Sequence, residues 1–160
     1  MMRANLRRIG VIATALVLVL TFGALAVRAA NGPQGALVHS CTARDQSFIQ
    51  TASIDMTALG ALANELKAGA VRPQAVAREA FDAAARVAHV TPNDPSLRQA
   101  QTYLDGMFSE YGNAVTLLAK GKDASSRMHR AYGLANFARD VLAEAQPELQ
   151  QQGCDVGPLL

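Results

Sequence analysis

Apolar residues recur every three or four positions in four consecutive stretches of the chain, with mostly polar residues between them. This spacing predicts amphipathic helices, each with one side facing a core. The predicted helices span Thr42 to Gly69, Pro73 to Val90, Asp94 to Gly121 and Asp123 to Gly153. Their core-facing positions include, in chain order, Ile49, Ala52, Met56, Leu59, Ala63 and Leu66; Val76, Ala80, Ala83, Val87 and Val90; Leu97, Ala100, Leu104, Met107, Tyr111, Ala114 and Leu118; and Met128, Ala131, Ala135, Ala138, Leu142, Ala145 and Leu149.

Helix-start and helix-stop signals support these boundaries. Thr42 followed by Asp45 has the spacing of a capping box. Pro73 suits the first turn of the second helix, and Pro92 ends that helix. Asp94-Pro95 has the order of an N-cap followed by a first-turn proline. Pro147 predicts a kink or an early end in the fourth helix.

Short connections between the helices favour antiparallel neighbours, so the predicted fold is an all-α, antiparallel up-down-up-down four-helix bundle. Further apolar residues widen each stripe to the width that a globular core requires; they are Phe48, Leu62, Phe81, Phe108, Val115, Phe137 and Val141. The predicted domain organisation is a targeting segment at 1–30, a linker at 31–40, the bundle at 41–154 and an apolar tail at 155–160.

The N-terminal segment predicts export. Arg3, Arg7 and Arg8 precede a run without charged residues over 9–27, which is 19 residues and long enough to span a bilayer. We therefore expect a transmembrane or signal helix, with the C-terminal domain outside a bacterial cell membrane. A single-pass anchor is favoured by the length of the run, and cleavage near Ala29 followed by secretion is the alternative. Lipidation at Cys41 is disfavoured because Val38-His39-Ser40 is a poor lipoprotein signal.

The two cysteines of the chain are Cys41 and Cys154. In an up-down-up-down bundle the start of the first helix and the end of the fourth lie at the same end. Exported cysteines are usually oxidised, so we predict a disulfide between them, against free thiols or an intermolecular bridge.

Charge argues against a generally basic nucleic-acid-binding protein. The net charge of +2 includes four arginines of the targeting segment, and the rest of the chain carries 11 basic and 13 acidic residues. The predicted topology gathers basic residues at the end of the bundle away from the membrane, where they could form a partner-facing basic cap or complement helix C-termini. These residues are Lys67, Arg72, Lys120, Lys122, Arg127 and Arg130.

The second predicted helix is shorter than its neighbours by about 12 Å at about 1.5 Å per residue. The deficit falls at the membrane-proximal end, beside Thr91 to Asp94. Either the apolar tail folds back over this gap or the gap is a groove for an apolar ligand or a partner helix. The groove would be lined by Phe48, His89, Leu97 and Leu149.

No catalytic or metal-binding motif is recognisable. The sequence lacks Glu-x-x-His pairs, a Cys-x-x-Cys-His haem motif, a phosphate-binding glycine loop and Gly-x-Ser-x-Gly. We predict no enzymatic activity, no metal and no cofactor. Met56, Met107 and Met128 lie on core-facing positions, so a haem site using His39, His89 or His129 is conceivable, but methionines more often fill gaps in a core.

A loose resemblance accompanies these features. Pro92-Asn93-Asp94-Pro95, Leu104, Gly121-Lys122-Asp123 and cysteines near both ends of an Ala-rich helical domain resemble membrane- or lipid-anchored four-helix proteins of bacterial envelopes. The resemblance covers most of residues 41–154 and implies no active site. We expect a non-enzymatic interaction or accessory module, as a subunit or assembly partner of a membrane complex. A protein that binds haem or another apolar small molecule in the bundle core is the alternative.

Overall fold

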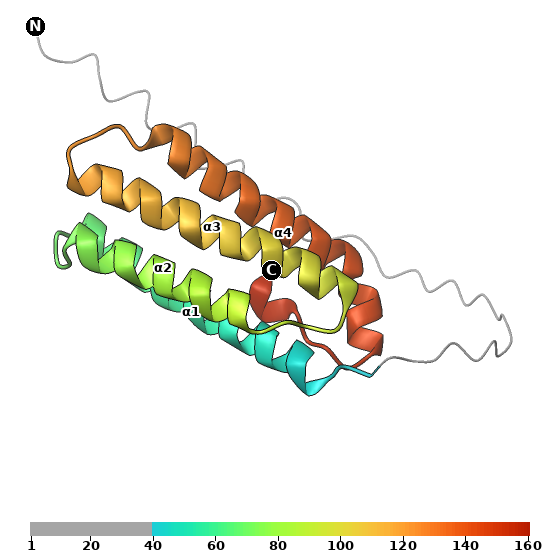
Figure 1. Cartoon of the computed structure of the whole chain (residues 1–160). Helices are drawn as coiled ribbons and strands as arrows, with labels where there is room; N and C mark the ends of the chain where they lie inside the picture. The colour runs from blue at the N-terminus through green and yellow to red at the C-terminus, as the bar shows by residue number, and fades with distance from the viewer. Residues whose placement is uncertain (1–39) are drawn as a thin grey trace, which may run out of the picture. The chain divides into compact units, whose positions relative to one another are not determined.

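The computed structural model describes residues 40–160, and these form an all-α bundle of four helices with no strand among them. The helices are α1 (Ala43–Lys67), α2 (Pro73–His89), α3 (Pro95–Ala119) and α4 (Ser125–Gln151), followed by the short 3₁₀ helix η1 (Gly157–Leu159). Consecutive helices run in opposite directions (Figure 1). The prediction of an all-α four-helix bundle is confirmed.

The predicted helix starts are mostly confirmed. Thr42 and Asp45 form the capping box of α1, with each side chain bonding the other residue's backbone N–H. Asp94 accepts hydrogen bonds from the backbone N–H groups of Ser96 and Leu97 and caps α3. Asp123 lies one residue before the N-cap of α4 and accepts from the backbone N–H of Ser125.

The lengths of α4 and α2 bear on two of the sequence predictions. Pro147 lies inside α4, which continues to Gln151, so the early end considered for this helix is wrong. The second helix has 17 residues against 25 in α1 and in α3 and 27 in α4, which confirms its predicted shortness.

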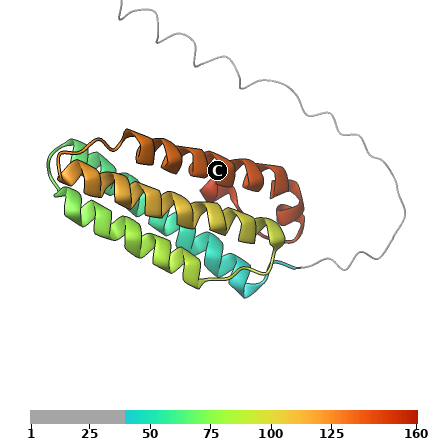
Figure 2. The same cartoon turned by 45° about the horizontal axis from the view of Figure 1, so that its top comes forward.

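We call the end that carries Cys41 and Cys154 the disulfide end, and the end with the α1–α2 and α3–α4 loops the far end (Figures 1 and 2). Cys41 and Cys154 are bonded, with their Cα atoms 5.2 Å apart and 113 residues between them in sequence. The backbone N–H of Cys41 also donates to the carbonyl of Gln152 at 2.8 Å. The start of α1 is therefore joined covalently to the end of α4.

Helix α3 lies at the centre of the packing, with extensive contacts to α2 and α4. Glycines allow the close approach on both sides. A Cβ added to Gly112 would meet the ring of Phe81 on α2 at 2.9 Å, and one added to Gly106 would meet Leu134 on α4 at 3.1 Å. Helix α1 has fewer contacts with α2, few with α3, and almost none with α4. The bundle is tight along α2–α3–α4 and open between α1 and α4.

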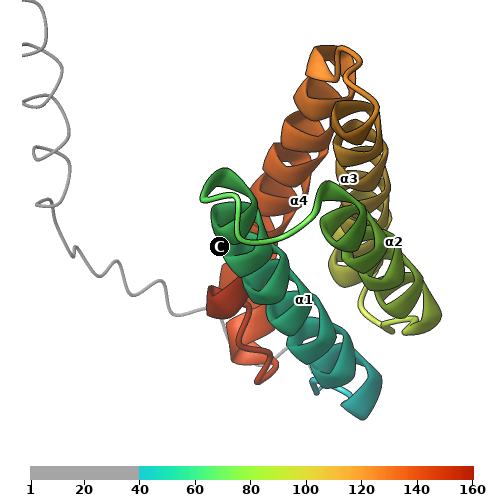
Figure 3. The ribbon, with the colours of Figure 1, turned by 90° about the vertical axis from the view of Figure 1, so that its left-hand side faces the viewer.

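Of the two alternatives for the gap beside the short second helix, the groove lined by Phe48, His89, Leu97 and Leu149 is wrong. Phe48, Leu97 and Leu149 are fully or almost fully buried in the core, and His89 is exposed on the outer surface. Val156 and Leu159 of the tail are buried in the same cluster. Figure 3 shows this C-terminal segment, in dark red, between α1 and α4. The tail lies against α1, and burial of its two apolar side chains stabilises this arrangement.

No helix in the described part of the chain is both long and apolar enough to cross a membrane. The apolar run over 9–27, on which the predicted anchor or signal depends, lies outside the described residues.

Candidate binding groove

An apolar groove runs between α1 and α4 in the far half of the bundle, with α3 as its floor. Its volume is about 450 Å³, within the range of about 300–1,000 Å³ usual for ligand sites. We call it the α1–α4 groove. Its lining residues are Met56, Leu59, Gly60, Ala63, Leu66 and Lys67 from α1; Met107, Phe108, Tyr111, Val115 and Leu118 from α3; and Met128, Ala131, Tyr132 and Ala135 from α4.

The groove exists because small residues face each other across it. Gly60 and Ala63 line the groove from α1, and Ala131 and Ala135 line it from α4. A Cβ added to Gly60 would meet no atom within 4 Å, in contrast to the crowded Gly106 and Gly112 of α3. The opposed α1 and α4 faces therefore leave space that their own side chains do not fill.

Large apolar side chains at the groove remain in contact with water. Tyr132 is 64% exposed and Leu118 is 49% exposed. Leu118 was predicted to face the core, and that prediction is wrong because about half of its side chain is exposed at the groove. Phe81 and Phe137, also predicted to contribute to the core, are 40% and 57% exposed on other surfaces.

Tyr111 contributes a partly buried phenol to the lining of the groove. Burial, and secondarily the neighbouring Tyr132, raises the pKa of Tyr111 above its usual value. Its hydroxyl therefore stays neutral near pH 7. A neutral phenol in an apolar groove offers one hydrogen-bonding group to an occupant at little electrostatic cost.

The three core-facing methionines Met56, Met107 and Met128 all line this groove. No imidazole joins them among the described residues: His89 is the last residue of α2, near the disulfide end, and His129 is exposed and outside the lining. The structure thus gathers flexible, polarisable thioethers without the histidine that a His/Met haem site needs. His39 lies outside the described residues.

The six residues of the predicted basic cap lie near the two far-end loops. Lys67 and Arg72 lie at the α1–α2 loop, and Lys120 and Lys122 lie at the α3–α4 loop. Arg127 is not free, because its guanidinium contacts Glu110 at 2.9 Å. Arg130 lies 3.9 Å from the same carboxylate. Lys67 lies in the last turn of α1, where its positive charge complements the partial negative charge of the helix C-terminus. It also lines the groove. The basic cap and the groove therefore share the far end of the bundle.

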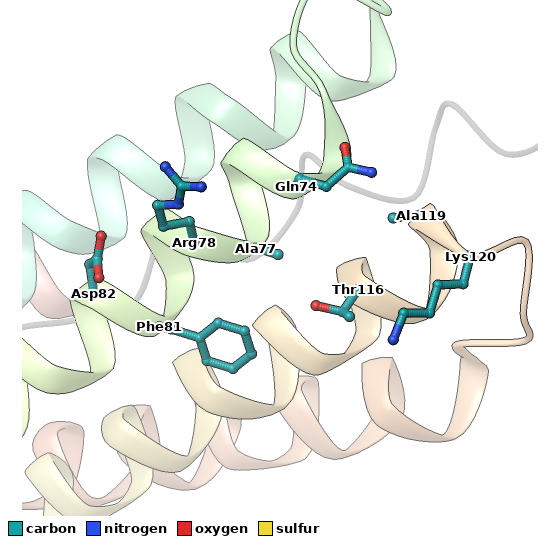
Figure 4. A pocket seen from close by; sticks show the side chains of 8 residues that line it. All are labelled: Gln74, Ala77, Arg78, Phe81, Asp82, Thr116, Ala119 and Lys120. Carbon is teal, nitrogen blue, oxygen red and sulfur yellow. The ribbon is translucent and has the colours of Figure 1, made fainter.

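A second hollow of about 390 Å³ lies between α2 and α3. Phe81 and Lys120 extend over it, whereas Arg78 and Asp82 point away from Thr116 (Figure 4). The Thr116 hydroxyl donates to the carbonyl of Gly112 at 2.8 Å. The polar groups that line this hollow do not converge on one point, so the hollow lacks the geometry of an acid–base or nucleophilic site.

Cys41, Asp45 and Cys154 bring potential metal-ligand atoms within 4.8 Å of one another. Both sulfurs are in the disulfide. The Asp45 carboxylate accepts from the backbone N–H groups of Thr42, Asn93 and Asp94 and from the Thr42 hydroxyl. The hydrogen bonds of Asp45 join the α2–α3 loop to the start of α1.

An ion pair between the buried carboxylate of Asp55 and the exposed side chain of Arg86 was not predicted from the sequence. Asp55 of α1 accepts from the Arg86 guanidinium at 2.7 and 3.0 Å, and Arg86 also contacts Glu79 at 2.6 Å. The hydrogen bond with Asp55, and then that with Glu79, raises the pKa of Arg86. Asp55 lies one position away from the expected core stripe, so helical spacing alone did not predict its burial.

The groove itself was also missed, because all its methionines and alanines were assigned to packing. A signal was present: three of the four helices carry a methionine on a core-facing position, Met56, Met107 and Met128, and Gly60 and Ala63 follow the first of them on α1. Methionine is used frequently at adaptable binding surfaces. Comparison with known protein families, curated proteins and solved structures finds no match for this chain.

Proposed function

We propose that this protein is a non-enzymatic interaction module outside a bacterial membrane, held there by its N-terminal segment, and that it binds a partner through the α1–α4 groove. The observation that carries the proposal is the apolar groove, left open beside α1 in a bundle whose α2–α3 and α3–α4 pairs pack closely. Exposed apolar surface of this kind costs solubility unless something covers it.

The location outside the membrane rests on two features. The Cys41–Cys154 disulfide is typical of an oxidising compartment. Arginines before the apolar run over 9–27 favour cytoplasmic retention of the N-terminus. Determining the N-terminal residue of the protein isolated from cells distinguishes the single-pass anchor from cleavage near Ala29.

Membership in a membrane complex follows from the same proposal, with the groove as the contact surface. The experiment replaces Tyr132 with a photoreactive benzophenone amino acid in cells, irradiates, and isolates the membranes. Tyr132 is suitable because it lines the groove and its side chain is exposed. The control places the same group at Asp140, an exposed residue of α4 outside the lining.

We expect one dominant protein adduct from position 132 and none from position 140. Equal labelling from both positions contradicts the proposal. Binding of an apolar small molecule is the second candidate, supported by the convergence of three methionines on the groove. An adduct from position 132 with the mass of a lipid or other small molecule, and no protein adduct, supports that candidate instead.

A further inference from the structure

The open side of the bundle, between α1 and α4, has two halves that follow each other along α1. Near the disulfide end the tail lies beside the first half of α1, where Gln46, Ile49 and Ser53 face Asp155 and Pro158. Val156 and Leu159 are buried there. The α1–α4 groove begins at Met56, beyond the residues of α1 that face the tail. The chain thus fills one half of this side with a short apolar helical segment of its own and leaves the other half unfilled.

We propose that the unfilled half takes an amphipathic helix of a partner protein, with its apolar face in the groove and acidic residues on its outer side. This inference rests on the proposed function and names the class of partner. From Met56 to Lys67 the groove follows α1 for about 16 Å, or about three turns at 1.5 Å per residue. Three turns accommodate apolar anchors at positions i, i+3 or i+4, and i+7.

The walls of the groove favour a helical occupant over an extended one. Both walls and the floor are α-helices, whose backbone groups are bonded within each helix. The groove therefore offers no strand edge to pair with an extended peptide. An extended peptide would bring unpaired backbone N–H and C=O groups against apolar side chains, whereas a helix satisfies its own.

The small residues permit the close approach that a fifth helix needs. Gly60 and Ala63 on one wall and Ala131 and Ala135 on the other leave room for the side chains of an inserted helix. Met56, Met107 and Met128 have unbranched side chains that adjust to its shape. The methionines distinguish the groove from the α2–α3 hollow, whose lining contains none.

Charge decides the polar side of the occupant. The lining includes Lys67 and no carboxylate, and Lys120 and Lys122 lie at the same end of the bundle. Glu110, the nearby acidic residue of α3, is already paired with Arg127. A helix with acidic outer residues is therefore favoured over one with basic outer residues, chiefly in its rate of association.

The test uses the full chain in detergent and three labelled synthetic peptides. One peptide has leucines at i, i+3, i+4 and i+7 with glutamates between them. The second has lysines in place of the glutamates, and the third has the residues of the first in an order that destroys the helical spacing. Fluorescence anisotropy measures binding. We expect saturable binding of the first peptide and at least 10-fold weaker binding of the other two.

Gly60→Leu and Gly133→Leu form a matched pair of variants. An added Cβ meets nothing within 4 Å at either helical position, but only Gly60 lines the groove. Both variants gain helix propensity and should unfold at a temperature no lower than the original chain. Gly60→Leu fills the groove and should weaken binding of the acidic helix at least 10-fold, whereas Gly133→Leu should leave it within 2-fold.

Lys67→Glu tests the charge argument and should weaken the acidic peptide while strengthening the basic one. Equal effects of the two leucine variants, or no preference for the acidic helix, overturn the inference. So does a labelled fatty acid that binds in a Gly60→Leu-sensitive way when no peptide does. Self-association that Gly60→Leu abolishes and the peptide does not inhibit identifies a second copy as occupant and also overturns it. A protein adduct from position 132 without acidic-peptide binding leaves the proposed function standing.

Discussion

The two halves of the α1–α4 side differ in what joins the helices. At the disulfide end they are linked by Cys41–Cys154, by the backbone bond from Cys41 to Gln152, and by the buried tail residues Val156 and Leu159. In the far half the facing residues are Gly60, Ala63, Ala131 and Ala135, with a groove between them. The same pair of helices is therefore fastened at one end and separated at the other.

Polar contacts of α1 follow the same division. Asp45 holds the α2–α3 loop through Asn93 and Asp94, and Asp55 binds Arg86 of α2. Beyond Asp55, no side chain of α1 makes a hydrogen bond or ion pair with another helix in the described part of the chain. The far half of α1 is attached through apolar contacts alone. The covalent and polar attachments of α1 are concentrated in its first half, so we expect the disulfide end to contribute more to stability than the far end.

Replacing both cysteines with alanine has the largest expected effect on this difference. A bond that closes a loop of 113 residues contributes about 4–5 kcal/mol on the chain-entropy estimate. Urea unfolding should therefore show a loss of that size in the free energy of unfolding, and amide exchange in the first half of α1 should rise toward that of its far half. The original chain under reducing conditions is the control. A loss below about 1 kcal/mol contradicts the assigned role of the disulfide end.

Leu159→Ala and Leu118→Ala compare the filled and unfilled halves with one chemical change. Leu159 is 4% exposed and Leu118 is 49% exposed. Truncating the buried leucine should cost about 2–4 kcal/mol, because it leaves a cavity where the tail is seated. Truncating the exposed one should cost less than about 1 kcal/mol. Thermal or urea unfolding measures both, and equal costs would remove the distinction between the two halves.

Asp45 makes the disulfide end sensitive to acid. Burial raises the pKa of Asp45, but the hydrogen bonds from the Thr42 hydroxyl and from the backbone N–H groups of Asp94, Thr42 and Asn93 together lower it below its usual value. A lowered pKa in the folded state means that the carboxylate stabilises the fold above about pH 4, the ordinary aspartate range. That contribution is lost as the pH falls through the folded-state pKa.

Asp45→Asn should therefore destabilise the protein at pH 7 by about 1–3 kcal/mol, the usual value of hydrogen bonds to a charged group. The difference from the original chain should shrink as the pH falls below about 4. Urea unfolding at pH 7 and at successively lower pH measures it. Glu65→Gln, in the exposed far half of α1, serves as the control and should change stability by less than about 0.5 kcal/mol at either pH. A difference for Asp45→Asn that does not vary with pH contradicts this account.

Local signals predicted the elements well because their causes are local. The Thr42–Asp45 box and the Asp94-Pro95 start depend on residues within one turn, and the structure contains both. The disulfide could be predicted across 113 residues because an up-down-up-down bundle places the start of the first helix and the end of the fourth at the same end. Asp55 was not predicted to be buried, since its partner Arg86 is 31 residues away and no local pattern identifies it.

The sequence by itself determined four amphipathic helices, the side-chain caps of α1 and α3 and the apolar tail, because periodicity and capping are properties of neighbouring residues. It could not determine which apolar faces would be covered. Gly60, Gly106 and Gly112 look alike in the sequence, yet two of them receive a neighbouring side chain at close range and one faces open space. Only the tertiary structure decided this, because coverage depends on where α1 lies relative to α4, and that is set by the disulfide, the tail and the contacts of Asp45 and Asp55.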